Sequence, residues 1–458
     1  MTPEERTFLR DFFRAVTDQP LEPTDPRYIS LYTDPNLVTD DPVELMARAI
    51  EWTPGESVQL FSGFRGTGKS TELRRLRKRL KESNYLVFLC DIEDYLNLST
   101  PVDVIDFLMA VAGAFSEAIT DTQLLGQPLQ EDYWTRLWNF LTRTQVNISE
   151  LSGGVDLKAA APATVTASIK ANLKSDPTFK QRVQKYLSGH LGALVADVRK
   201  FVENCVKQLK QRLGQDREVV LLLDSVEHIR GTSINAIEVQ SSVETLFASH
   251  ADKLRLPYLH VVYTVPPYLK VRYPNLGTLY QGGIQVLPAF KLRNTDHSIF
   301  QQGLDAIERV VRARGDWQRL LGERTVLDHI SLCSGGHLRD LLRLLAEILR
   351  RADRLPTSEH TVTTAINQVR TEFFPIADAD AQWLARIAKT HEAGLQDIAQ
   401  LPNFARFLDI HMALCYRNGE EWYDVHPLIY DQVNKQAAAA TSPQSSPTIP
   451  ASKVTAKP

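Results

Sequence analysis

The sequence contains few of the residues from which disulfide scaffolds and zinc sites are built. Its 458 residues include only four cysteines, Cys90, Cys205, Cys333 and Cys415, which lie far apart and form no CxxC pair. The 11 histidines form no HxxxH or HExxH pair. These spacings argue against a disulfide framework and a zinc site, and they are typical of a protein from a reducing compartment.

Long apolar runs and a strong net charge are also absent. No apolar stretch approaches the ~20 residues that a membrane-spanning helix needs, and residues 1–14 are charged throughout, unlike a signal peptide. The 52 basic and 55 acidic residues leave a net charge of −3, which gives no general attraction for nucleic acid or an anionic membrane. We therefore expect a cytoplasmic protein with no membrane partner.

One octapeptide, residues 63–70 (GFRGTGKS), matches the phosphate-binding pattern GxxxxGK[ST] and lies between a strand-like and a helix-like run. Its glycines let backbone N–H groups approach phosphates closely, at the positive end of the following helix. Lys69 is expected to reach the β- and γ-phosphates, and Ser70 to bind Mg²⁺. The loop therefore predicts a nucleoside triphosphate site. Expected nucleotide contacts come from Gly63, Arg65, Gly66, Thr67, Gly68, Lys69, Ser70 and Thr71.

Apolar runs of strand length alternate with helical patterns along the first two thirds of the chain. The strand-like runs are 57–61, 85–91, 219–224, 259–264 and 283–287. Strands that alternate with helices predict an α/β fold with a doubly wound parallel sheet.

An insertion over residues 120–215 interrupts this alternation. Its pattern predicts a helix over 132–144, strand-like alternation over 153–171, and a long helical segment over 177–213. Apolar residues recur every three or four positions along the long helix. This stripe either packs on its own domain or forms an exposed coiled-coil arm that recognises a partner.

The whole pattern divides into five parts. They are an N-terminal helical arm and connector (1–45), a P-loop core with its helical insertion (46–290), a helical lid (291–375), a small module (376–434) and a disordered tail (435–458).

Two acids follow the apolar run 219–223. Asp224 ends this run, where the carboxyl edge of a parallel sheet would direct it at a bound Mg²⁺ together with Ser70. Glu227 is the best candidate to orient and deprotonate an attacking water. The alternatives are a solvated strand end for Asp224, and for Glu227 a first-turn acid favoured by a helix dipole.

This segment resembles the Walker B segment of STAND-type NTPases, including the NACHT and KAP families, within the wider AAA+ group. The shared pattern is an aliphatic run, Asp224, a small residue, an aliphatic residue and an acid at plus three. Many AAA+ ATPases place a glutamate directly after the aspartate, where this chain has Ser225. The resemblance covers about residues 45–355 without the insertion. It implies ATP as the nucleotide, and no guanine-specific NKxD motif is present.

The same resemblance implies three further roles. Thr264 matches a polar sensor residue, and the segment 335–339 (GGHLR) resembles an Orc/Cdc6-like lid signature in which Arg339 reaches the γ-phosphate. Arg272 stands where AAA+ relatives carry an arginine finger that acts on a neighbouring subunit, and Arg230 is the other candidate. Each of these arginines also fits a plain surface residue.

Residues 376–434 resemble a winged helix. Helices are predicted over 379–390, 395–401 and 403–410, and a hairpin over 411–425 turns at Asn418-Gly419. Initiator-type relatives use such a module on DNA. Here four basic residues oppose nine acidic ones, which gives a net charge of −5 and disfavours DNA. A protein contact or an intramolecular role is favoured.

The basic run 74–81 is explained by its place on the solvent-exposed side of a helix. Leu73, Leu76 and Leu80 define the buried side of its helix, so the charges form a solvated face rather than a nucleic-acid site.

The sequence thus predicts a STAND/AAA+-like regulatory ATPase that binds and hydrolyses ATP with Mg²⁺. Nucleotide state would be coupled to a partner protein or to self-association. Two alternatives remain: a DNA-associated ATPase of initiator type, and a nucleotide switch that does not hydrolyse.

Overall fold

A computed structural model describes the chain except for residues 127–128, 144–161, 233, 281, 419 and 442–458. Its centre is a five-stranded sheet in which every pairing is parallel. The strands are β1 (Ser57–Gly63), β2 (Leu86–Asp91), β3 (Val219–Asp224), β4 (Leu259–Val265) and β5 (Gln285–Leu287). Their order is β2-β3-β4-β1-β5, so β4 lies between the strand before the P-loop and the strand that ends in Asp224.

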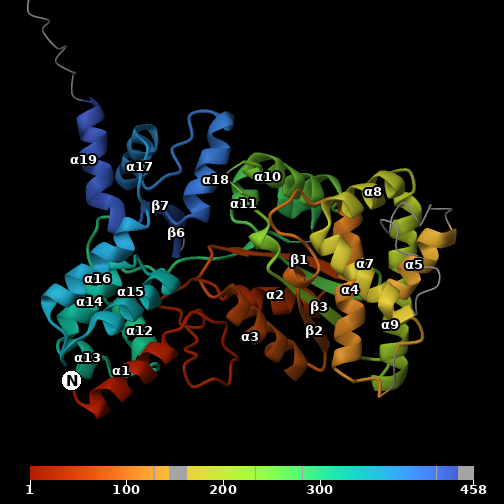
Figure 1. Cartoon of the computed structure of the whole chain (residues 1–458), viewed down its shortest axis with the longest axis horizontal. Coiled ribbons are helices and arrows are strands. Elements are labelled where there is room, and N and C mark those ends of the chain that lie inside the picture. Colours follow the sequence, from red (N-terminus) through yellow and green to blue (C-terminus); the bar gives the residue numbers. More distant parts are fainter. Residues whose placement is uncertain (127–128, 144–161, 233, 281, 419, 442–458) are drawn as a thin grey trace, which may run out of the picture.

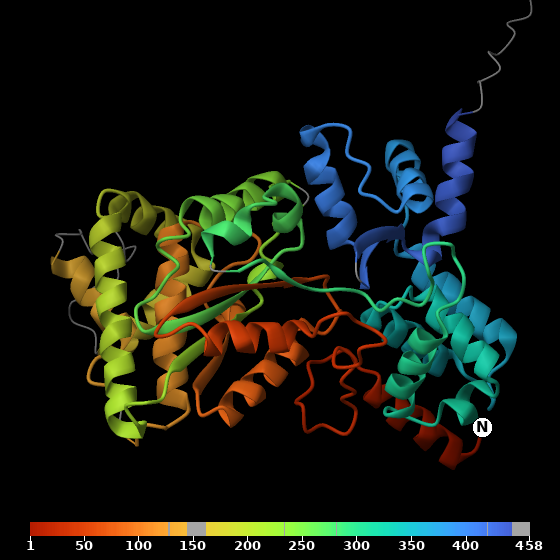
Figure 2. The same ribbon diagram turned by 180° about the vertical axis from the view of Figure 1, so that it is seen from behind.

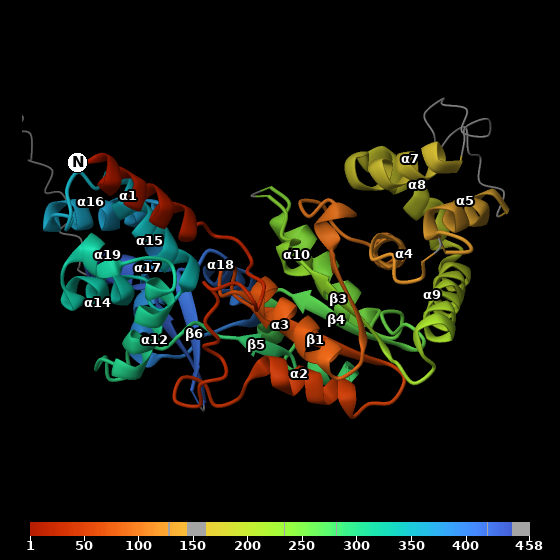
Figure 3. The same ribbon diagram turned by 90° about the horizontal axis from the view of Figure 1, so that it is seen from below.

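Helices cover both faces of this sheet (Figures 1 and 3). On one face, α2 (Pro42–Glu51) and α3 (Lys69–Glu82) pack against alternate side chains of the strands, such as Phe61. On the other face, α4 (Val104–Asp121) and α10 (Ala236–Glu244) bury the intervening side chains. Strands that are buried on both faces have continuous aliphatic sequences, which is why the sequence pattern predicted their positions. The predicted α/β fold class is confirmed.

The described part of the insertion forms helices beside α4. They are α5 (Tyr133–Arg143), α7 (Pro162–Ser175), α8 (Pro177–Ser188) and α9 (Leu191–Leu213).

One of the predictions for this insertion was wrong, because residues 162–171 are helical rather than strand-like. The helical segment predicted over 177–213 is confirmed, as two helices that meet at Gly189-His190. The start of the strand-like stretch, 153–161, lies outside the described residues. The apolar stripe of α9 is buried against α4, so α9 is not an exposed arm.

The helical lid follows β5. It comprises α12 (Gln301–Arg312), α13 (Trp317–Leu321), α14 (Arg324–Cys333), α15 (Leu338–Arg351) and α16 (Glu359–Thr371). The N-terminal helix α1 (Pro3–Ala15) packs on this lid and not on the sheet, because Leu9 and Phe12 are buried in the lid's apolar cluster (Figure 2). The connector after α1 therefore spans from the lid back to the core.

The C-terminal module consists of helices and one antiparallel hairpin. Its elements are α17 (Asp378–Thr390), α18 (Leu401–Asp409), β6 (Ala413–Asn418), β7 (Glu420–Val425) and α19 (Tyr430–Thr441). The hairpin was predicted, although Gly419 of its turn lies outside the described residues. The helix predicted over 395–401 is only a 3-10 turn, Ile398–Gln400. Helix α19 covers residues 435–441, where the sequence predicted the beginning of a disordered tail.

Core, lid and module meet at the glycine pair before α15. Gly336 has a left-handed φ of +76°, and a Cβ at this position would collide with the Phe290 carbonyl oxygen. Phe290 N–H donates to Gly336 O at 3.1 Å, and Tyr416 of the hairpin donates its hydroxyl to Gly335 O at 2.7 Å. The glycine pair is therefore explained by close packing at a junction.

Substitution Gly336→Ala is expected to destabilise the fold by at least about 2 kcal/mol, because it combines left-handed strain with overpacking. Urea unfolding measures this loss. Gly192→Ala, in α9 where an added Cβ has open space around it, serves as the control and should be neutral or slightly stabilising. Equal stabilities of the two variants would contradict the packing described here.

Candidate nucleotide site

A cavity of about 330 Å³ opens at the carboxyl edge of the sheet. Its walls come from the P-loop and the start of α3, the connector over residues 18–32, the ends of β2 and β3, Phe290, and residues in or next to helices α12 and α15 of the lid. This edge is where open parallel sheets bind ligands, and the volume suits a small molecule.

Lys69 begins α3 and is buried at the floor of this cavity. Its ammonium donates to the carbonyl oxygens of Gly63 and Phe64, both at 2.9 Å, and lies 3.1 Å from Glu227 Oε1. A lysine has three N–H donors, and the two carbonyl oxygens accept from two of them, while Glu227 forms an ion pair with the same ammonium. An incoming phosphate would therefore compete with Glu227 for this ammonium.

Asp224 lies at the end of β3, paired in register with Asp91 of β2. The hydroxyl of Ser70 forms a hydrogen bond with the Asp224 carboxylate. Burial and the negative charge of Glu227 raise the pKa of Asp224 to about 6, although the Ser70 bond opposes this change. A divalent cation beside this carboxylate would offset both unfavourable effects.

The backbone after Asp224 explains how an acid three positions later reaches the site. Ser225 has a left-handed φ of +67°, and one 3-10 turn, Val226–His228, follows it. The Thr264 hydroxyl at the end of β4 accepts from Val226 N–H at 3.0 Å and fixes this turn. The turn directs Glu227 back over the strand end toward Lys69.

The Glu227 carboxylate is buried and strongly polarised. Burial raises its pKa, but the charges of Lys69 and His228 and a hydrogen bond from Thr264 outweigh burial, so the pKa lies below its ordinary value. Its Oε2 has no hydrogen-bond partner among the described residues. Glu227 is therefore ionised and has one oxygen available to accept a proton or orient water.

The lid contacts the P-loop through the first turn of α15. Arg339 N–H donates to Gly66 O at 3.2 Å, and the Arg339 guanidinium binds Asp18 of the connector. A Cβ on Gly66, whose φ is +90°, would collide with the Arg339 side chain. Gly66 thus permits the lid to approach. Burial and the charges of Arg230 and Arg339 lower the pKa of Arg65, so three guanidinium groups lie near one another at this rim of the site.

The structure brings together only some of the predicted site residues. Gly66, Thr67, Gly68, Lys69, Ser70, Thr71, Asp224, Glu227 and Arg339 line the cavity. Gly63, Arg65 and Thr264 do not line it; Gly63 and Arg65 contribute carbonyl oxygens to its framework, and Thr264 positions the Glu227 turn. Arg272 pairs with Glu244 of α10, away from this cavity. Its role as an arginine finger stays a prediction, as does that of Arg230.

Sequence reasoning missed the connector and His228. Leu21 N–H donates to the Thr71 hydroxyl at 3.1 Å, and the Tyr32 hydroxyl contacts Thr67 O at 3.3 Å and donates to Pro288 O at 3.0 Å. These bonds hold the connector across the site, where its apolar residues form one wall. No motif marks such a segment, because its contacts depend on where the tertiary fold places it.

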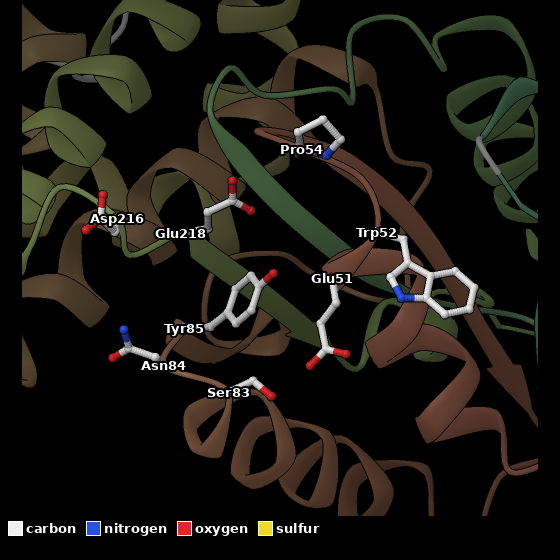
Figure 4. Close-up of a pocket in the computed structure, with 8 residues that line it drawn as sticks. All are labelled: Glu51, Trp52, Pro54, Ser83, Asn84, Tyr85, Asp216 and Glu218. Atoms are coloured by element: carbon white, nitrogen blue, oxygen red, sulfur yellow. The ribbon is translucent and has the colours of Figure 1, made fainter.

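A second cavity, of about 360 Å³, lies at the opposite edge of the sheet (Figure 4). It is lined by the ends of α2 and α3 and by residues before β2 and β3. Two of its acids are already paired, because Glu51 binds Arg79 and Glu218 binds His260. It contains no part of the P-loop, so we do not assign it to the nucleotide.

Comparison with known proteins gives only distant similarities. No family model and no curated protein matches the sequence. A Walker-type ATPase of Pyrococcus abyssi aligns with a TM-score of 0.43 at 14% identity, over 92% of this chain and 99% of that chain. The Aeropyrum pernix ORC2 protein, in its ADPNP-ADP complexes, aligns with a TM-score of 0.43 at 13% identity, over 93% of this chain and 98% of that chain. The resemblance to STAND-type NTPases stays a prediction.

A search of the described residues finds no helix with the length and apolar character needed to cross a membrane.

The raised pKa of Asp224 predicts a pH-dependent stability difference. Its pKa is about 6 in the fold against an ordinary 3.8, so its ionisation destabilises the fold progressively as pH rises from about 4 to 6. We expect Asp224→Asn to be more stable than the wild type by up to about 2 kcal/mol above pH 6, and to lose this advantage near pH 4. Chemical unfolding without Mg²⁺ at both pH values measures it; a pH-independent difference would contradict the assignment.

Proposed function

We propose that this chain binds ATP with Mg²⁺ at the P-loop and hydrolyses it, and that nucleotide state governs how the lid and C-terminal module sit on the core. The observation that carries the proposal is the convergence of Lys69, the Ser70–Asp224 pair and Glu227 at one edge of the sheet, with Arg339 against Gly66. A cation for phosphate, oxygen ligands for Mg²⁺ and a carboxylate base are the parts that phosphoryl transfer to water requires.

The residues present fit Mg²⁺. Ser70 and Asp224 offer hydroxyl and carboxylate oxygens that already contact each other, and such oxygens are the ligands that Mg²⁺ prefers. Bound there, the ion would neutralise charge on the β- and γ-phosphates.

The Lys69–Glu227 ion pair gives the site an internal order of events. A γ-phosphate attracted to Lys69 competes with Glu227 for the same ammonium. When phosphate takes this contact, the Glu227 carboxylate loses its cation and becomes a stronger base, because the charge of Lys69 was what lowered its pKa. Glu227 then accepts the proton of the attacking water while Thr264 holds the turn that carries it.

The C-terminal module is better suited to a protein or intramolecular contact than to DNA. Its hairpin faces the core and lid, since Ala289 N–H donates to Cys415 O at 3.1 Å and Lys270 of α11 (Tyr268–Arg272) binds Glu421. Trp422 stacks on Tyr416 at 4.5 Å between ring centroids and so packs within the module. With its net charge of −5, this module has an excess of acids that repels phosphates.

Two exposed apolar side chains between the Glu227 turn and the first turn of α10 offer a contact region for a partner protein. Ile234 and Ile237, just after the turn that carries Glu227, are 96% and 73% exposed. Large apolar side chains at such exposure favour a protein contact. A partner bound there would sense movement of the Glu227 turn, which is the behaviour expected of a regulatory ATPase.

Two substitutions separate binding from hydrolysis. Lys69→Ala should abolish ATP binding, because it removes the phosphate cation. Glu227→Gln should bind ATP at least as tightly as the wild type and lower turnover about 100-fold or more, because it loses the base and the competing ion pair. Calorimetric titration and phosphate release measure these effects, with Glu238→Gln on the exposed face of α10 as the control.

The outcomes distinguish the alternatives. A wild type that binds no nucleotide would remove the whole proposal. Binding with negligible turnover, unchanged in Glu227→Gln, would indicate a switch that does not hydrolyse. Strong stimulation of turnover by duplex DNA would replace the proposed role with a DNA-associated one.

A further inference from the structure

A buried carboxylate, Asp340 of α15, is surrounded by three imidazole rings. His337 immediately precedes α15, while His411 and His426 flank the hairpin of the C-terminal module. Asp340 Oδ2 lies 2.7 Å from His337 Nδ1, 3.3 Å from His426 Nε2 and 3.6 Å from His411 Nδ1. All four residues are buried. This cluster joins the lid to the module, and His337 extends it to the P-loop.

The two hydrogen bonds of His337 fix its charge. Its Nε2 lies 2.7 Å from the Arg65 carbonyl oxygen of the P-loop, which can only accept, so Nε2 must carry a hydrogen. Its Nδ1 lies 2.7 Å from the Asp340 carboxylate, which also accepts. A neutral imidazole has one ring hydrogen, so making both bonds requires the doubly protonated, positively charged ring.

The other two rings stay neutral. Leu428 N–H donates to His426 Nδ1 at 3.2 Å, so the single ring hydrogen of His426 is on Nε2, facing Asp340. Burial and the charge of His337 lower the pKa of His411 to about 3. The cluster therefore holds one imidazolium, and that is His337.

A proton fits this cluster better than a metal ion does, although His337, Asp340 and His411 could in principle ligate one. Two ligands of a tetrahedral zinc ion lie roughly 3.4 Å apart, whereas His337 Nδ1 and Asp340 Oδ2 are at the hydrogen-bond distance of 2.7 Å. Arg343 also donates to Asp340 Oδ1 at 3.0 Å, so the carboxylate already has one cation. A divalent ion would leave excess positive charge in a buried site.

The charges around His337 balance when the ring is protonated. The titratable and charged groups that face the cluster are Asp340 and Arg343 of α15, Glu372 bound to Arg343, and His411 and His426 of the module. Two carboxylates then oppose one guanidinium and one imidazolium. Glu372 is exposed and Arg343 partly exposed, whereas Asp340 and His337 are buried. Loss of the His337 proton leaves these four groups with a net negative charge and one broken hydrogen bond.

We propose that His337 is a charged positioning residue that holds the P-loop against the lid and the C-terminal module, by donating one N–H to the Arg65 carbonyl and the other to Asp340. It acts on the nucleotide through the neighbouring contact of Arg339 with Gly66. The inference rests on the proposed nucleotide site. Nucleotide affinity then depends on the ring proton of His337, which lies outside the nucleotide cavity. This residue lies where the core, the lid and the C-terminal module meet.

The test measures the Kd for ADP by calorimetry in EDTA between about pH 8 and 10, so that the carboxylate of Asp224 is ionised throughout and no Mg²⁺ is present. Wild-type affinity should fall about tenfold or more toward alkaline pH, because one charge-assisted hydrogen bond is lost. Asp340→Asn should bind ADP with an affinity that no longer depends on pH. The introduced amide can donate to a neutral His337, so the second proton is no longer needed.

Two further variants and a metal assay complete the test. His337→Gln should bind weakly at every pH, whereas His329→Gln, an exposed histidine of the same lid, should keep the wild-type pH profile. The inference is wrong if Asp340→Asn keeps the wild-type profile, if wild-type affinity is flat, or if the purified chain holds stoichiometric zinc that His411→Ala releases. A wild type that binds no ADP at any pH would instead refute the proposed nucleotide site.

Discussion

The buried ammonium of Lys69 is the charge on which the rest of this site depends. It is held by two P-loop carbonyls and by Glu227, and it keeps that glutamate ionised although burial opposes ionisation. The ionised glutamate in turn raises the pKa of Asp224. Two carboxylates close together in a buried cavity are unfavourable unless cations accompany them. The charges of the site therefore favour binding of Mg²⁺ beside the two carboxylates. They also allow a phosphate to replace Glu227 as the partner of Lys69.

The sheet order gives this arrangement its geometry. Because β4 lies between β1 and β3, Thr264 can fix the turn after Asp224 from the neighbouring strand. The left-handed Ser225 and one 3-10 turn then return Glu227 to Lys69. The lid closes the same edge through backbone contacts at Gly66 and Arg65, and the Gly335-Gly336 turn lets the hairpin reach that junction. The P-loop, the lid and the C-terminal module thus meet at one junction.

Much of this could be predicted from the sequence where physical periodicity is strong. Buried parallel strands are continuous aliphatic runs, and the P-loop has a dense local pattern, so both were located correctly. Periodicity failed in the insertion, where small residues over 162–171 alternate like a strand but pack as α7. The Asp340 cluster and the connector wall could not be predicted, because their members lie far apart in the sequence and carry no spacing signal.

The central claim, a nucleotide held between the P-loop and the lid, is tested most directly by hydrogen exchange with and without a non-hydrolysable ATP analogue and Mg²⁺. We expect the backbone amides in residues 64–71 and in residues 337–343 to become more protected, because the nucleotide stabilises the contact between these two segments. Unchanged exchange in both segments, or protection confined to parts of the chain away from the carboxyl edge of the sheet, would contradict this claim.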